Sequence, residues 1–161
     1  MQQRIVPNLW FDTEAEEAAD FYTSVFKNSR VVSVTHYTEG APREAGMVMT
    51  VHFELDGQRF VGINGGPEFK FDEAVSFEIT CVNQDEVDFY WERLSDGGEE
   101  GQCGWLKDRF GLSWQVVPTG IEELFAGADP ERAQRAMQAM LQMTKLDIAA
   151  LRSAADGVPA S

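Results

Sequence analysis

One pattern occurs twice in this chain, and it constrains the fold more than any other feature of the sequence. The tripeptide Asp-Phe-Tyr at residues 20–22 recurs 68 positions later at residues 88–90, inside a helical pattern each time. The same offset carries residues 9–11 (Leu-Trp-Phe) onto residues 77–79 (Phe-Glu-Ile), with apolar side chains at matching alternate positions. The matched strand and helix predict two copies of one unit, each built as a strand, a helix and further strands.

The first half is typical of one helix among four strands. Thr13, with Glu16 three residues later, is typical of a capping box, so we expect the helix to begin there and to end near Asn28. The dipeptide Asp-Gly at residues 56–57 predicts a tight hairpin turn. We expect the four strands at residues 5–11, 30–37, 47–55 and 58–63.

The second half repeats this plan. A strand is expected at residues 74–81, and Asn83 with Glu86 is typical of a second capping box. The helix that follows should end near Ser95, because the two glycines at residues 97–98 stop it. A short extended segment and a hairpin would complete this half.

The hairpin is expected within residues 102–118. Its turn is predicted at residues 108–111 (Asp-Arg-Phe-Gly), with an acid at the entry and a glycine at the exit. A loop of these four residues places Trp105 opposite Trp114, as a cross-strand aromatic pair that stabilises the hairpin.

Beyond Pro118 the pattern changes to helices. Asp129 followed by Pro130 is typical of a helix start, and this helix should run to about Lys145. Its polar residues form a single stripe, and nearly every other residue is Ala, Met or Leu. Because so wide an apolar arc exceeds one contact surface, we expect the helix to pack on its own body and on a second subunit. The alternative is a terminal helix that covers only the edge of its own domain. We expect two shorter helices at residues 121–125 and 147–155.

The charge balance excludes some classes of partner. The 161 residues include 27 acidic and 13 basic side chains, a formal net charge of −14. Such a surface repels phosphate backbones and anionic membranes, so we expect neither nucleic acid nor membrane as a partner. The first residues lack the apolar core of a signal peptide, and no apolar run reaches about 18 residues. With two scattered cysteines, Cys81 and Cys103, the sequence predicts a cytoplasmic protein with reduced thiols.

Four segments resemble the PhnB-like proteins, a group commonly labelled 3-demethylubiquinone-9 3-methyltransferase-like. These proteins form one branch of the glyoxalase/bleomycin resistance/dioxygenase superfamily, also called vicinal oxygen chelate proteins. The segments are LWFDTEAEEAADFY (9–22), SVFKNSRV (24–31), INGGPEFKF (63–71) and GQCGWLKDRFGLSWQVVP (101–118).

The resemblance implies an α+β fold of tandem βαβββ modules, at about residues 4–66 and 74–118, whose sheets curve into a cup. The paired modules would form a domain over residues 1–120, and residues 121–161 would be a C-terminal helical extension of the same domain. The resemblance also implies a homodimer. It implies little about a reaction, because this branch is largely uncharacterised and its methyltransferase label is inherited.

In the metal-dependent members of this fold, side chains from the first and last strand of each half hold a divalent ion. Carried onto this chain, those positions include Val6 and Ala74, which cannot ligate. A catalytic divalent site usually needs about three His or carboxylate ligands, and only Glu78 qualifies, so we expect no metal. The resemblance places six side chains in the cup as a ligand-binding set: Asn8, Trp10, Asn64, Ser76, Glu78 and Gln115.

Glu78 is the best candidate for a catalytic residue, and no other catalytic residue can be identified. Enclosed in the cup, it could act as an acid or a base, or pair with a cationic ligand. The alternative is that Glu78 is solvated or paired with a nearby Arg or Lys. An aromatic wall with a few polar groups suits a small organic molecule.

The sequence therefore favours a small-molecule-binding protein of the PhnB-like branch, with no metal, no cofactor and no assigned reaction. One alternative is an enzyme, either a methyltransferase acting on a quinone-like aromatic or a metal-dependent isomerase or dioxygenase. Against methyl transfer, the glycine pairs at residues 65–66 and 97–98 open no helix, as a turn that binds S-adenosylmethionine would. A further alternative is a structural or interaction protein whose cup is filled by side chains.

Overall fold

The computed structural model describes residues 2–159 of the chain. The chain divides into two compact units, Met1–Phe71 and Asp72–Ser161. Each unit contains a four-stranded sheet, in which the first strand runs parallel to the last and the other neighbours are antiparallel. The predicted α+β fold, with tandem βαβββ modules and a C-terminal helical extension, is confirmed.

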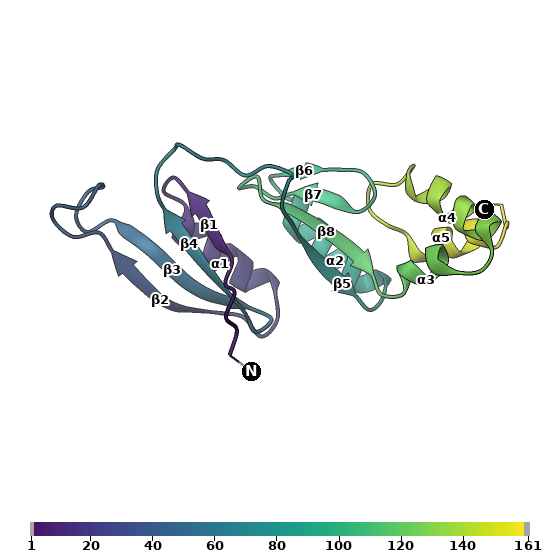
Figure 1. Ribbon diagram of the computed structural model, residues 1–161, viewed down its shortest axis with the longest axis horizontal. Helices are drawn as coiled ribbons and strands as arrows, with labels where there is room; N and C mark the ends of the chain where they lie inside the picture. Colours follow the sequence, from purple (N-terminus) through teal and green to yellow (C-terminus); the bar gives the residue numbers. More distant parts are fainter. Residues whose placement is uncertain (1, 160–161) are drawn as a thin grey trace. The chain divides into compact units, whose positions relative to one another are not determined.

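The first unit consists of β1 (Asn8–Phe11), α1 (Ala15–Val25), β2 (Arg30–His36), β3 (Val48–Leu55) and β4 (Gln58–Asn64). The strands lie in the order β1-β4-β3-β2, and α1 packs against one face of the sheet (Figure 1). Tyr22 of α1 is fully buried and its ring stacks on Phe53, which stacks in turn on Phe60. The helix comes close to the sheet at Gly62, where a Cβ would lie 3.2 Å from the Cβ of Ala15.

The N-terminus of α1 is capped by a distant strand. The predicted capping box of Thr13 and Glu16 was wrong, because the residue at the cap is Glu14 and its side chain accepts no capping bond. Instead the Oδ1 of Asn64, at the end of β4, accepts a hydrogen bond of 2.9 Å from the backbone N–H of Ala15. One of the unpaired donors of the first turn is thus satisfied by a residue 49 positions away.

The second unit repeats the plan with β5 (Ser76–Cys81), α2 (Gln84–Ser95), β6 (Glu99–Glu100), β7 (Trp105–Lys107) and β8 (Ser113–Pro118). The strand order is β5-β8-β7-β6, and α2 packs against one face of the sheet (Figure 1). Here the predicted cap by Asn83 is confirmed, although the Glu86 carboxylate accepts from the residue before the cap rather than from the cap itself. The Asn83 side chain accepts a bond from the N–H of Glu86, and the Glu86 carboxylate accepts one from the N–H of Val82, both at 2.9 Å.

The two halves do not repeat with one constant offset. Their first strands begin 68 residues apart, as predicted, but their helices begin 69 residues apart. The buried position that Tyr22 holds in α1 is therefore held in α2 by Trp91, while Phe89 of the repeated tripeptide is exposed. The repeat of Asp-Phe-Tyr locates the second helix but predicts its buried face one residue out of register.

A buried carboxylate sets the register of the hairpin between β7 and β8. The Oδ1 of Asp108 accepts the N–H groups of Phe110 at 2.8 Å and Leu112 at 3.1 Å. Its Oδ2 accepts the indole N–H of Trp114 at 2.9 Å. These bonds draw Leu112 into the loop, which has five residues instead of the expected four. Trp105 and Trp114 therefore lie on opposite faces of the sheet, and the predicted aromatic pair was wrong.

The C-terminal extension contains α3 (Ile121–Ala126), α4 (Pro130–Met140) and α5 (Ile148–Ala155). The predicted cap is confirmed, because the Asp129 side chain accepts bonds from the first two N–H groups that follow Pro130. The helix ends well before Lys145, however. Part of its apolar arc packs on α3 and α5, whereas Met137 and Leu141 are 40% and 54% exposed. Within residues 2–159, no helix is long and apolar enough to cross a membrane.

The backbone just before β7 holds the extension on the second unit. The N–H groups of Cys103 and Gly104 donate to the carbonyls of Met143 and Thr144, at 2.8 Å each. Gly104 has a φ of +83°, and a Cβ there would lie 2.9 Å from the carbonyl oxygen of Val116. Glycine is therefore required at this position for the extension to dock.

The N-terminal turn of α2 adds a second set of contacts to the extension. The Gln84 amide donates to the carbonyl of Leu146 at 3.0 Å and accepts from the N–H of Ile148 at 2.9 Å. Lys145 forms an ion pair of 2.8 Å with Asp88. Hydrogen bonds from Lys145 and, to a lesser extent, Gln84 hold the pKa of Asp88 below its ordinary value.

We expect Cys81 to be inert to alkylation in the folded protein. Its side chain is fully buried, and burial, with a smaller contribution from the charge of Glu86, raises its pKa to about 12. The measurement is the intact mass of a Cys103→Ser variant after exposure to iodoacetamide at pH 8. We expect no added group in buffer and one in denaturant, and rapid labelling in buffer would contradict the burial of this thiol.

Candidate functional site

Each sheet has one face opposite its helix, called here its open face, and two predicted residues lie on the open face of the first sheet. Asn8 and Trp10 pair in register with Val61 and Ile63 of β4. Asn8 is exposed, and its amide donates to the carbonyl of Val6 at 3.0 Å. Asn8 is thus the more accessible of the two.

Trp10 is held in place by the segment that follows β4. Its indole N–H donates to the carbonyl of Gly66 at 2.9 Å. Its ring lies so close to Gly65 that a Cβ there would be 2.2 Å from a ring carbon, and the ring of Phe69 packs edge-on at 5.0 Å. This indole is therefore a packed side chain, with its polar hydrogen already bonded within its own unit.

Asn64 does not join these two residues. It is 2% exposed and lies on the face that α1 covers, one residue out of phase with the open face. Its Nδ2 donates to the carbonyl of Val48 at 3.0 Å, and its Oδ1 caps α1. The side chain that the sequence assigned to ligand binding is engaged in holding the first unit together.

The second sheet brings together the other three predicted residues. Glu78 and Gln115 are register partners, and the Gln115 Nε2 donates to the Oγ of Ser76 at 2.9 Å. All three lie on the open face of the second sheet. Gln115 lies between Glu78 of β5 and Trp105 of β7, its register partner on the adjacent strand. Glu78 is exposed rather than enclosed, which agrees with the alternative of a solvated carboxylate.

A hollow that the sequence did not predict lies on the same open face. Its volume is about 200 Å³. Ser113 lines it and is 1% exposed. Among residues 2–159 the Ser113 Oγ is the one buried side-chain nitrogen or oxygen that has no hydrogen-bond partner. The residues around the hollow are Glu73, Glu99, Glu100, Gly101, Trp105, Leu106, Lys107 and Ser113.

The hollow adjoins the predicted residues through the sheet register. Ser113 pairs with Ser76 of β5 on one side and with Lys107 of β7 on the other. Alternation with Leu112 and Trp114 could have placed Ser113 on the open face, but its burial has no sequence signal. The expected loop of four residues instead of five also places Ser113 opposite the wrong neighbour.

The charges around the hollow are predominantly negative. Lys107 is paired with Glu73, and this hydrogen bond lowers the pKa of Glu73 and raises that of Lys107. Glu99 pairs with Lys107 in register and adds a second carboxylate. Glu100 points to the helix side, where its carboxylate accepts the indole N–H of Trp91 at 2.9 Å. The hollow therefore favours neutral or cationic groups over anions.

The donor chemistry does not fit a metal ion. Within residues 2–159, no group of three or more His, Cys, Asp or Glu side chains is placed to hold one. On the second sheet the polar groups near the hollow are the Ser113 hydroxyl, the Gln115 amide, the Glu73–Lys107 pair, the Glu99 carboxylate and the Glu100 carboxylate, which is bonded to Trp91.

Comparisons with known proteins agree with this fold. The sequence profile of the family described as 3-demethylubiquinone-9 3-methyltransferase matches residues 3–117. A PhnB protein from Bacillus cereus is 35% identical, with a TM-score of 0.67, over 73% of this chain and 100% of that chain. A protein from Pseudomonas aeruginosa, at 18% identity, has a TM-score of 0.60 over 73% of this chain and 98% of its own.

The more distant relatives show the fold alone. The fosfomycin resistance protein FosX from Listeria monocytogenes is 14% identical, with a TM-score of 0.51, over 76% of this chain and 98% of its own. Among proteins of curated function, none matches the chain. The family profile ends at residue 117, before the C-terminal extension begins. The chain belongs to the PhnB-like family described as 3-demethylubiquinone-9 3-methyltransferase.

Proposed function

We propose that this protein binds a small organic molecule on the open face of its second sheet and acts as a carrier or sequestering module. One observation carries the proposal, namely the buried, unpartnered Ser113 hydroxyl that lines a hollow beside Trp105. A buried polar group without a partner costs about 1–3 kcal/mol. A ligand that hydrogen-bonds to this hydroxyl would remove that cost.

The surrounding groups define the ligand class. The indole of Trp105 offers a flat apolar surface, which suits an aromatic or other planar ring. Glu99 and the Glu73–Lys107 pair border the hollow, so a neutral or cationic ring that carries a hydroxyl or amine fits better than an anion. A volume of about 200 Å³ lies below the usual range of about 300–1,000 Å³ for drug-sized ligands, which favours a small molecule.

Two variants test the proposal together. We expect Ser113→Ala to weaken binding of a hydroxylated or amino aromatic about five- to tenfold, because one hydrogen bond of about 1 kcal/mol is lost. The same change should leave the free protein as stable as before, or more stable by up to about 1 kcal/mol, because it removes an unpaired polar atom. Trp105→Ala should abolish detectable binding. Affinity is measured by calorimetry against a panel of phenols, aryl amines and quinones, and stability by thermal unfolding.

Ser33→Ala, on β2 of the first unit, is the matched control and should change neither quantity. A purely structural role for Ser113 predicts the opposite result, a less stable Ser113→Ala variant. A panel in which no compound binds, or in which Ser113→Ala binds as well as the unaltered protein, rules out this site.

A further inference from the structure

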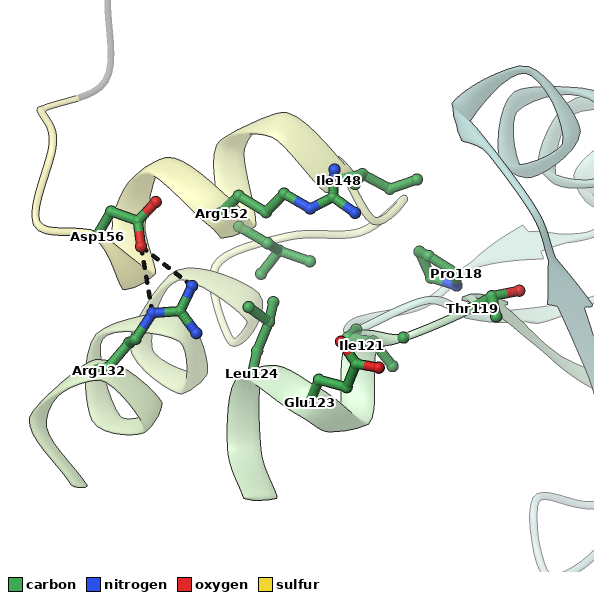
Figure 2. A pocket seen from close by; sticks show the side chains of 11 residues that line it. Pro118, Thr119, Ile121, Glu123, Leu124, Arg132, Ile148, Arg152 and Asp156 are labelled. Atoms are coloured by element: carbon green, nitrogen blue, oxygen red, sulfur yellow. Dashed lines mark hydrogen bonds and ion pairs between the residues drawn. The ribbon is translucent and has the colours of Figure 1, made fainter. Parts of the chain in front are cut away.

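A second hollow lies in the part of the chain that the family profile does not cover. It is formed where the end of β8 meets α3, α4 and α5, and its volume is about 200 Å³ (Figure 2). All of its residues follow residue 117, where the family match ends. The lining side chains are those of Pro118, Thr119, Ile121, Glu123, Leu124, Arg132, Ile148, Leu151, Arg152 and Asp156, together with Gly120.

The walls of this hollow are aliphatic. Figure 2 shows Ile121 and Leu124 of α3 on one side and Ile148 of α5 on the other, and Leu151 of α5 also lines the hollow. Leu151 is 1% exposed, whereas the other three are half-buried. Such a surface gains free energy when an apolar group covers it and removes it from water.

Two of the four charged groups in the lining, Arg132 and Asp156, are already engaged with each other. The Nε and Nη2 of Arg132 both donate to Oδ1 of Asp156, at 3.2 and 3.0 Å. The carboxyl carbon of Glu123 lies 4.0 Å from the position of a Cβ on Gly120, so this carboxylate folds back over the first turn of its own helix. These groups leave Arg152 as the cation to consider.

Arg152 is unpaired. Within residues 2–159 its guanidinium has no hydrogen bond or ion pair, although acidic side chains outnumber basic ones two to one in the chain. Figure 2 shows its side chain extended along α5 toward Ile148, away from the Arg132–Asp156 pair. An unpaired guanidinium beside an aliphatic hollow is complementary to a carboxylate that carries an apolar body.

We propose that this hollow binds a small aliphatic or aryl-substituted monocarboxylate, with its carboxylate on Arg152 and its apolar body between α3 and α5. The guanidinium can hold both carboxylate oxygens at once, which a lysine cannot do. Inorganic phosphate or sulfate would meet the same charge but leave the aliphatic walls uncovered. The site is separate from the hollow at Ser113 and does not depend on the function proposed above.

The test uses 4-methylpentanoate and 3-phenylpropanoate on the full-length protein. We expect dissociation constants on the order of 0.1–1 mM, measured by calorimetry, as for other ligands of this size. Methyl resonances of Ile148 and Leu151 should shift on titration, which locates the binding. Arg152→Gln should weaken binding at least tenfold. Arg152→Lys should weaken it less, because lysine keeps the positive charge but cannot hold both carboxylate oxygens at once. Glu123→Gln should strengthen binding, because it removes a negative charge from the lining.

Controls separate this site from others. Because Arg152 is exposed and unpaired, Arg152→Gln should keep the melting temperature of the unaltered protein. Arg59→Gln, in the first unit, and Ser113→Ala should both leave the affinity for carboxylate unchanged. Equal binding by Arg152→Gln, or equal binding of 4-methylpentanamide and 4-methylpentanoate, would overturn the proposal. So would the absence of methyl shifts at 20-fold the expected dissociation constant.

Discussion

Replacing Asp108 by alanine is expected to lower the free energy of unfolding of the second unit by about 3–5 kcal/mol. The carboxylate is 2% exposed and accepts three hydrogen bonds, from two backbone N–H groups and from the indole of Trp114. Alanine leaves all three donors without an acceptor, and each unsatisfied buried donor costs about 1–3 kcal/mol. The loop that sets the register of β7 and β8 also loses the bonds that close it.

Two further variants calibrate this result in urea unfolding. Asp108→Asn keeps one oxygen for the two backbone donors but places an NH₂ group against the indole N–H, so we expect a loss of about half as much. Asp96→Ala removes an exposed carboxylate from a surface ion pair with Arg109 and should cost less than about 1 kcal/mol. A loss below about 1 kcal/mol for Asp108→Ala would show that the three bonds do not form in solution.

Replacing Leu146 by alanine is expected to release the C-terminal extension from the second unit. Leu146 is 1% exposed and lies between the two sets of backbone contacts that hold the extension. Its γ-carbon would lie 3.1 Å from a Cβ on Gly104, so it packs directly on this glycine. Leu→Ala at a fully buried site costs about 3–5 kcal/mol.

The release should be local and therefore visible by hydrogen exchange. We expect the amides of α5 to exchange on a far shorter time scale in Leu146→Ala, while those of β5 and β8 stay protected. Leu141→Ala is the matched control, because the same side chain on the same extension is 54% exposed and should change neither stability nor exchange by much. Unchanged protection of α5 in Leu146→Ala would contradict the packing described here.

Sequence patterns predicted the parts of this fold that depend on neighbouring residues. The alternating strands, the hairpin at residues 56–57 and the cap of α2 by Asn83 each rest on contacts within a few positions. In the hairpin, Asp56 and Gly57 both adopt positive φ angles, as the Asp-Gly pair predicts. Such features can be derived from one sequence because their physical causes lie close together along the chain.

Two of the errors have one cause in common, which is a side chain that bonds to a partner other than the expected one. Asp108 reaches forward to Trp114 and lengthens its loop by one residue, so the aromatic pair fails to form. Asn64 turns to the helix instead of the open face. The alternation of apolar and polar side chains does not by itself determine how long a loop is. It also does not determine which face of the sheet the last side chain of a strand lies on.

The candidate site also combines residues that were expected there with residues that were not. The register of β5 and β8 brings together Ser76, Glu78 and Gln115, three of the six residues that the family resemblance placed in the cup. Trp105 and Ser113, which line the hollow, were not predicted as site residues. Their role depends on the burial of one hydroxyl, and burial of a small polar side chain leaves no pattern in a sequence. Ligand binding itself and the homodimer stay predictions.

The two helical caps have a consequence for the order in which the protein assembles. The cap of α2 is complete as soon as residues 82–86 are present, so this helix can begin to form from its own neighbourhood. The cap of α1 waits for Asn64, the last residue of the last strand of its unit. During synthesis α1 therefore leaves the ribosome before the residue that completes it. Closing that long loop costs chain entropy before the cap of α1 can form, a cost that the cap of α2 does not carry.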